Sequence, residues 1–217
     1  MEFDGQFETH VTARADGPAG VEALRAWAAR RGLKFHHIEL DRGRTPSQPM
    51  VTRQGSGRLS QQLAAAQELA HDLADAGFAV CRIKVEAAPD NRDVPTTDGE
   101  ATRHPGRYFE HHVKLALTAD ADLAALATLA GRHGARLSRN ARRRRDEGTA
   151  ERFVTQRCHG VGLTTARREF DALRHALAAA GYVAVKVEQE YVVWDSNLAD
   201  DAGWLDAAPA EDLEGPP

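Results

Sequence analysis

The sequence contains one five-residue pattern twice, FETHV at residues 7–11 and FEHHV at residues 109–113. Phenylalanine, glutamate, histidine and valine recur at the same places in the two copies. The same register aligns Gly32 with Gly134 further along the chain. Self-similarity at a fixed offset is the mark of an internal repeat.

The alignment continues through the rest of both copies. After one residue of slippage the triplet MVT (residues 50–52) meets FVT (residues 153–155), and after another Glu86 meets Glu190. Drift in loop length between duplicated units leaves small slips of this kind. The chain is therefore predicted to be a tandem duplication.

Each copy contains the same series of predicted elements. Alternation of apolar and polar residues predicts half-buried strands, and apolar residues at helical spacing that end at a glycine predict helices. The predicted strands are 7–13, Lys34–Leu40, Met50–Arg53, Ala79–Glu86, Phe109–Leu117, Arg136–Asn140, Phe153–Arg157 and Val183–Val193. The predicted helices are 20–31, Ser60–Ala76, Leu123–Arg132 and Thr165–Ala180.

This order of elements, βαββαβ in each copy, is the ferredoxin-like unit. We therefore expect an α+β fold with two antiparallel sheets, helices on their outer faces and a pseudo-two-fold relation between the copies. The expected domains are a first repeat at 1–88, a Pro-, Asp- and Thr-rich linker at 89–106, a second repeat at 107–195 and an acidic C-terminal tail at 196–217.

Composition excludes several classes of protein. The 217 residues include 42% hydrophobic and 28% charged residues, an ordinary balance for a globular protein. No apolar run approaches the roughly 20 residues that span a bilayer, and the acidic start does not have the pattern of a signal peptide, so a cytoplasmic protein is expected. The net charge of −4 argues against general affinity for nucleic acid. Cys81 and Cys158 match no zinc motif or disulfide framework.

The candidate site follows from strand periodicity, because alternate residues of a strand share one face. On the first strand of each copy Phe7 and Phe109 face the helices, which leaves the polar residues on the opposite face. The charged or polar residues predicted on that face are Glu8, His10, Thr12, Arg82, Lys84, Glu86, Glu110, His112, Lys114, Lys186, Glu188 and Glu190. If the uncovered faces of the two repeats meet, these groups line a cleft where they are partly desolvated and need partners.

Such a cleft suits an anionic small molecule or nucleotide, above all a phosphorylated one. His10 and His112 titrate near neutral pH and are the acid–base candidates, with Thr12 and Lys114 as catalytic neighbours. The predicted ligand-binding residues are Glu8, Glu110, Arg82, Lys84, Lys186, Arg53, Arg152 and Arg157. If the protein is an enzyme, hydrolysis or transfer of a phosphoryl group is the expected reaction.

Two short motifs and one set of four residues resemble features of known families. His10-Val11-Thr12 resembles one His-x-Thr/Ser motif of the two-histidine phosphoesterases, which implies that paired histidines act as acid and base on a phosphodiester. The set His10, Glu86, His112 and Glu190 resembles the metal site of vicinal-oxygen-chelate proteins, which implies a divalent-metal site. Glu110-x-His112-x-Lys114 is similar to the Glu-x-Glu-x-Lys strand of triphosphate-tunnel enzymes.

Other readings of the sequence stay open. With respect to cofactors, the expectation is either none or one divalent metal bound by His10, Glu86, His112 and Glu190. The arginine-rich stretch Arg139–Arg157 predicts, as a non-catalytic alternative, an RNA- or protein-binding module. The chain is expected to be a monomer or a homodimer that does not partner a membrane.

Overall fold

The computed structural model describes residues 2–141 and 149–205. Its first repeat consists of β1 (Asp4–Arg14), α1 (Gly17–Arg30), β2 (Lys34–Leu40), β3 (Ser47–Arg58), α2 (Leu59–Asp75) and β4 (Ala79–Ala87). Its second repeat consists of β5 (Tyr108–Thr118), α4 (Leu123–Arg132), β6 (Ala135–Asn140), β7 (Thr149–His159), α5 (Leu163–Ala179) and β8 (Val183–Asp195). A short helix, α3 (Asp98–Ala101), lies in the linker, and a 3-10 turn, η1 (Leu198–Asp201), follows β8. No helix in the described part of the chain is long and apolar enough to cross a membrane.

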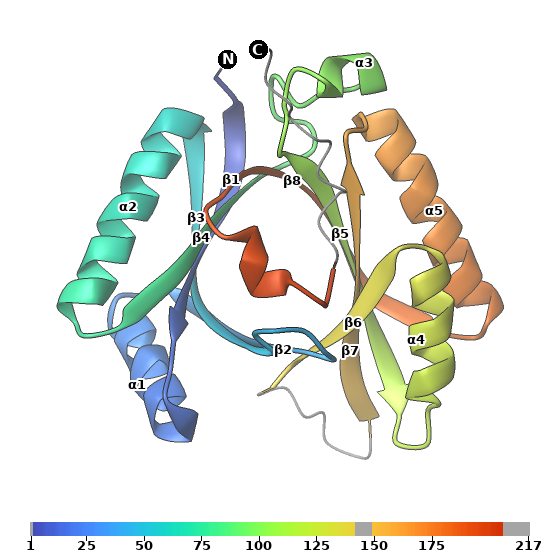
Figure 1. The fold of residues 1–217 in the computed structure, drawn as a ribbon, viewed down its shortest axis with the longest axis horizontal. Helices are drawn as coiled ribbons and strands as arrows, with labels where there is room; N and C mark the ends of the chain where they lie inside the picture. Colours follow the sequence, from blue (N-terminus) through green and yellow to red (C-terminus); the bar gives the residue numbers. More distant parts are fainter. Residues whose placement is uncertain (1, 142–148, 206–217) are drawn as a thin grey trace, which may run out of the picture.

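The predicted α+β fold of tandem ferredoxin-like units is confirmed. Each repeat forms a four-stranded antiparallel sheet, with the strand orders β4-β1-β3-β2 and β8-β5-β7-β6. The two sheets do not stay separate, because β2 pairs with β6 and β4 pairs with β8 to close an eight-stranded barrel (Figure 1). Closure satisfies backbone groups that four edge strands would otherwise expose.

The pseudo-two-fold axis passes through one of these two seams. There Ala87 of β4 pairs with Tyr191 of β8, and the two residues occupy equivalent positions in their repeats. The equivalent glutamates Glu86 and Glu190 directly precede this pair, so the axis brings them close together.

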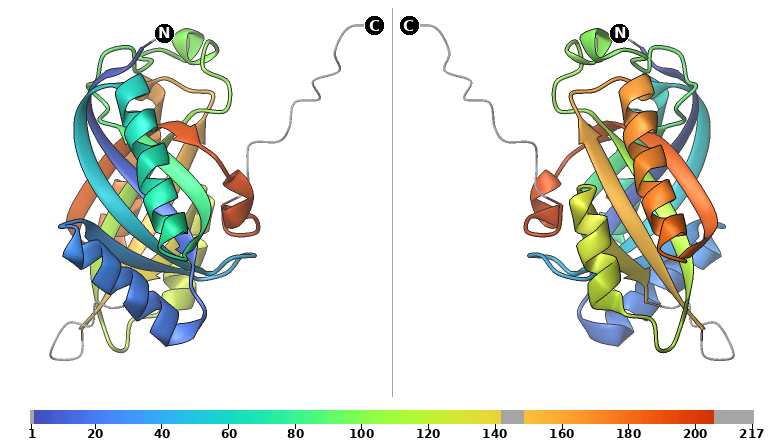
Figure 2. Two further views of the ribbon diagram at one scale, coloured as in Figure 1. Left: turned by 90° about the vertical axis from the view of Figure 1, so that its left-hand side faces the viewer. Right: turned by 90° about the vertical axis from the view of Figure 1, so that its right-hand side faces the viewer.

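The apolar core lies between the barrel and the helices that cover its outer surface (Figures 1 and 2). In the first repeat α1 and α2 pack on outward-facing strand residues to form a cluster that contains Val11, Leu24, Trp27, Val51 and Leu73. The second repeat has an equivalent cluster of Val113, Leu126, Val154, Phe170 and Leu173. Because the apolar residues of each strand face outward to the helices, the polar residues face the barrel interior.

The turns after the first helix of each repeat show why the copies share glycines. Gly32 and Gly134 both adopt left-handed backbone conformations, with φ of 67° and 66°. A residue with a Cβ is strained there, so a glycine ends each helix.

His111 is the one histidine of the FEHHV pattern that faces the core. It is fully buried and stacks on Phe170, with ring centroids 4.5 Å apart. Burial, together with the nearby positive charge of His112, lowers the pKa of His111 to about 4. The ring is therefore neutral in the folded protein at physiological pH.

Replacing His111 with phenylalanine is expected to make the free energy of unfolding depend less on pH below neutrality. A pKa that is lower in the folded state contributes stability that is complete above the ordinary value of 6.5 and is lost as the pH falls toward 4. Between pH 8 and pH 5 the native protein should lose about 2 kcal/mol through this group, a loss that His111→Phe avoids. Urea unfolding at both pH values measures the difference. Equal losses in the two proteins would contradict the assignment.

Candidate functional site

The barrel encloses a polar cavity of about 270 Å³. Every strand contributes inward-facing side chains to its lining, as the alternation within each strand requires. The cavity lies between the two repeats, and both repeats supply ionisable groups to it. The uncovered faces of the two sheets therefore converge.

Six side chains form a row across six adjacent strands of the barrel. In strand order β3, β1, β4, β8, β5 and β7 they are Thr52, His10, Glu86, Glu190, His112 and Thr155. The row reads the same from either end, since the pseudo-two-fold axis passes between its two glutamates. The duplicated histidine and glutamate thus produce one composite site instead of two separate ones.

The threonines fix the orientation of the histidines. The Nδ1 atom of His10 lies 2.8 Å from the Thr52 hydroxyl, and Nδ1 of His112 lies 2.9 Å from the Thr155 hydroxyl. The opposite nitrogen, Nε2, of each ring therefore points along the row toward the carboxylates. Nε2 of His10 is 2.9 Å from Glu86 Oε2, and Nε2 of His112 is 3.5 Å from Glu190 Oε2.

Burial and charge determine the protonation of the row. Burial opposes the positive charge of His112, but hydrogen bonds to Glu110 and Glu190 outweigh it and raise its pKa to about 10. The pKa of His10 is also raised, because Glu86 outweighs the effect of burial. Burial would raise the pKa of Glu86, yet Lys84 and His10 hold it well below its ordinary value. Burial and the negative charge of Glu86 raise the pKa of Glu190.

Five of the predicted cations line the barrel interior, and each of them contacts a carboxylate. Lys84 Nζ lies 2.6 Å from both Glu86 and Glu110, and Lys114 Nζ lies 2.8 Å from Glu151. Three further pairs join Arg157 to Glu110, Lys186 to Glu188, and Arg82 to Asp195. The interior is therefore nearly balanced in charge instead of strongly basic.

The segment after β8 packs against the barrel and was not recognised as part of the site from sequence. Asp201 is 1% exposed, and its carboxylate lies 2.8 Å from Arg82, 2.5 Å from Arg157 and 2.8 Å from the Gln48 side chain. The indole of Trp204 donates a 2.8 Å hydrogen bond to the Leu137 carbonyl. Figure 1 shows this segment across the barrel opening, and Figure 2 places it at one end. We call residues 196–205 the C-terminal plug.

Two predicted ligand-binding arginines do not reach the cavity. Arg53 follows Thr52, which faces inward, so Arg53 faces outward and is exposed. Arg152 likewise alternates with Phe153, which lines the cavity, and its guanidinium donates to the Glu151 carbonyl. Their placement in the cleft was wrong because the strands continue through both positions and keep their alternation.

The remaining predicted residues lie on the cavity wall. Glu8 accepts a 2.9 Å hydrogen bond from Gln54 and lies 3.8 Å from His10. Thr12 is buried on the wall, but the hydroxyl that contacts His10 belongs to Thr52 of the neighbouring strand. A sequence signal for that contact existed, because the aligned triplets MVT and FVT pair Thr52 with Thr155.

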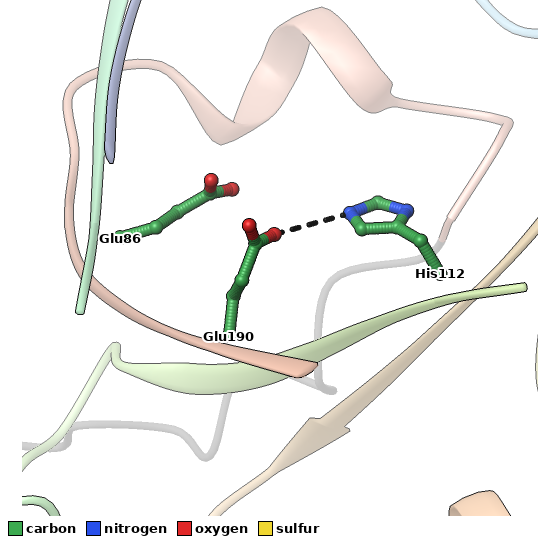
Figure 3. A group of neighbouring side chains, drawn as sticks. All are labelled: Glu86, His112 and Glu190. Atoms are coloured by element: carbon green, nitrogen blue, oxygen red, sulfur yellow. Dashed lines mark ion pairs between the residues drawn. The ribbon is translucent and has the colours of Figure 1, made fainter. Parts of the chain in front are cut away.

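The centre of the row has the composition of a metal site. One ligand atom each from Glu86, His112 and Glu190 lie within 4.8 Å of one another (Figure 3). His10, the fourth predicted metal ligand, contacts the Glu86 carboxylate but lies outside this group of three. Oxygen and imidazole donors suit Mn²⁺, Zn²⁺ or Fe²⁺. A metal-binding histidine typically makes a hydrogen bond through its other ring nitrogen, as Nδ1 of His112 does with Thr155.

The arginine-rich stretch does not form a single surface in the described part of the chain. Arg142–Arg145 lie outside the described residues. Arg139 contacts Glu39 across the seam between β2 and β6, and Arg157 is inside the barrel.

No protein-family model matches the chain, and no curated protein sequence matches it. Among solved structures, the small subunit of acetolactate synthase from Thermotoga maritima is similar with a TM-score of 0.28 and 11% identity, over 87% of this chain and 98% of that one. The ligand-free regulatory subunit of aspartate kinase from Thermus thermophilus is similar with a TM-score of 0.33 and 13% identity, over 81% of this chain and 95% of that one. Superpositions this weak support no inference about function.

Proposed function

We propose that the barrel binds a small phosphate-bearing anion together with a divalent cation held by Glu86, His112 and Glu190. The observation behind the proposal is the convergence of these three ligand atoms within 4.8 Å in the barrel cavity, where both repeats contribute ionisable groups. Two neighbouring carboxylates are costly to bury unless positive charge compensates them, and without a metal Lys84, His10 and protonated His112 supply that charge. A divalent cation would take over this role at Glu86 and Glu190, and His112 would give up its proton to bind it.

The balance of charge explains why cation and anion would bind together. The cavity-lining arginines and most of the lysines already contact carboxylates, so a bare anion would meet no excess of positive charge. A cation at Glu86 and Glu190 adds two positive charges and competes with Lys84 for Glu86. Lys84 keeps its contact with Glu110 and, once released from Glu86, can also contact a phosphate oxygen.

His10 would serve as the acid–base group for hydrolysis or transfer of a phosphoryl group. Its ring is oriented by Thr52 and hydrogen-bonded to Glu86, next to the proposed cation. Positioned histidines of this kind move protons in phosphoryl chemistry. The resemblance of His10-Val11-Thr12 to the two-histidine phosphoesterases is consistent with this role, with His112 acting as a metal ligand instead of the second acid–base group.

Replacing Glu190 with glutamine is expected to weaken Mn²⁺ binding by about 100-fold, since loss of even a group that only hydrogen-bonds to a metal ligand costs about 10–100-fold. Isothermal titration calorimetry, first with Mn²⁺ and then with inorganic pyrophosphate, measures the affinity for each. The matched control is Glu188→Gln, which changes the next inward residue of the same strand but no proposed ligand. Pyrophosphate should bind more weakly without Mn²⁺.

Two results would contradict the proposal. One is Mn²⁺ affinity that is equal in Glu190→Gln and Glu188→Gln, which would move the metal elsewhere. The other is tight pyrophosphate binding that is indifferent to Mn²⁺, which would remove the cation from the site.

A further inference from the structure

One edge of β8 is unpaired in the part of the chain that the structure describes. β8 pairs with β5 from Val183 to Val192, but it pairs with β4 only from Tyr191 to Asp195. Across residues 2–141 and 149–205, no strand therefore covers the second edge of Val183–Gln189. Such an edge presents a row of free backbone donors and acceptors.

The equivalent edge of the first repeat is covered by the chain itself. β4 extends beyond β8 at Ala79–Ile83, and the start of the C-terminal plug lies along it. Ser196 N–H donates to the Ile83 carbonyl at 3.0 Å, the Ile83 N–H donates to the Ser196 hydroxyl at 2.8 Å, and the Asn197 amide donates to the Cys81 carbonyl at 3.1 Å. After β4, in contrast, the linker turns back to β1, where Ala88 N–H donates to the Gln6 carbonyl. An extended segment thus covers one of the two equivalent edges and leaves the other bare.

Exposed valines flank the bare edge. Val183, Val185 and Val187 are 64%, 42% and 42% exposed. They do not share one face, because the register with β5 shifts at Val185: Val187 lies opposite Val113 on the outer face, and Val183 lies opposite Ala116 on the other face. The helix α5 packs beside β5 and β8 and leaves these valines partly exposed. An open strand edge with exposed valines is a surface for the addition of another strand.

We propose that this edge pairs with the same edge of a second copy, antiparallel, to form a two-fold symmetric dimer centred on Val187. In this register Lys186 of one copy lies opposite Glu188 of the other, twice across the interface. The Val187 side chains of the two copies then lie side by side on the outer face. The inference is independent of the proposed ligand.

Charge selects this register over its neighbours. A dimer centred on Lys186 would set the two lysines opposite each other, and one centred on Val185 would set Lys186 opposite Ala184. Like charges directly opposite each other destabilise strand pairing, and opposite charges stabilise it. The charges also disfavour pairing with unrelated strands, which makes a second copy the fitting partner.

Sedimentation equilibrium from about 1 to about 100 µM tests the dimer through a charge swap. Lys186→Glu and Glu188→Lys each create two like-charge contacts and should weaken dimerisation about 30-fold, which corresponds to about 2 kcal/mol. The double variant Lys186→Glu/Glu188→Lys restores opposite charges and should dimerise within about threefold of the native protein. Leu123→Glu, an equally exposed apolar site away from the edge, should leave the equilibrium unchanged.

Hydrogen exchange provides a second measurement that does not depend on any variant. Amides of Val183–Gln189 should exchange more slowly at high protein concentration than at low concentration, while those of β1 should not change. A native protein that stays monomeric at about 100 µM with unprotected amides overturns the proposal. So does a dimer that the single charge reversals leave intact, because that dimer uses another surface.

Discussion

Replacing Asp201 with alanine is expected to destabilise the folded protein by about 3–5 kcal/mol. Its carboxylate is 1% exposed and contacts both Arg82 and Arg157. Removal of one partner of a buried ion pair leaves the other charge without compensation in a medium of low dielectric. Here one carboxylate serves two buried guanidinium groups, which would keep only Asp195 and Glu110 as partners. Urea unfolding at neutral pH measures the change in the free energy of unfolding.

A surface ion pair supplies the matched control. Asp171 contacts Arg174 at 3.1 Å, with the two side chains 54% and 47% exposed. Asp171→Ala should cost less than about 1 kcal/mol, because water screens an exposed pair. Equal effects of the two substitutions would mean that the C-terminal plug adds little to stability.

Added anions should rescue the Asp201→Ala variant. With the carboxylate absent, Arg82 and Arg157 form a vacant anion site at the barrel end, and acetate or phosphate can occupy it. Either anion at about 100 mM should recover part of the lost stability, as ligand binding to the folded state does. The native protein should respond less, since Asp201 already occupies that place.

The sequence was sufficient to predict the repeat unit but not to predict that the two sheets close into one barrel. Duplicated strand and helix patterns predict two sheets, because periodicity reports which face of a strand is buried. The seams at β2–β6 and β4–β8 join edges of different repeats, and no local pattern specifies such pairs. The register at Ala87 and Tyr191 is a property of the assembled fold.

The candidate site was predictable where the duplication repeats chemistry. His10, His112, Glu86 and Glu190 stand at equivalent places on strands whose alternation directs them inward. Asp201 was not predictable in the same way, because the plug has no counterpart in the first repeat and an acidic segment after the last strand resembles a solvated tail. Its role depends on Arg82 and Arg157, which are distant in sequence.

Replacing Lys84 with methionine is expected to change apo stability and metal affinity in opposite directions. Without a metal, Lys84 compensates Glu86 and Glu110, so its loss should destabilise the protein by about 3 kcal/mol. With a metal, Lys84 is a positive charge that competes at Glu86, so its loss should tighten Mn²⁺ binding by about tenfold or more. Pyrophosphate binding should weaken in the same variant, because the proposed anion contact is gone.

The changes in stability and in Mn²⁺ affinity have opposite signs. They therefore distinguish a ligand-binding role of the charged residues around Glu86 from a purely structural role. If the charges of the row only stabilise the barrel, Lys84→Met lowers the free energy of unfolding and leaves Mn²⁺ affinity unchanged. Lys186→Met is the control, since this lysine contacts Glu188 at the rim, is 59% exposed and lies away from Glu86. It should alter both quantities little. The two repeats differ at the inward-facing position that is Lys84 in the first repeat and Glu188 in the second. The lysine therefore makes the first repeat's half of the barrel the side where the anion would bind, and the cation would bind at the centre.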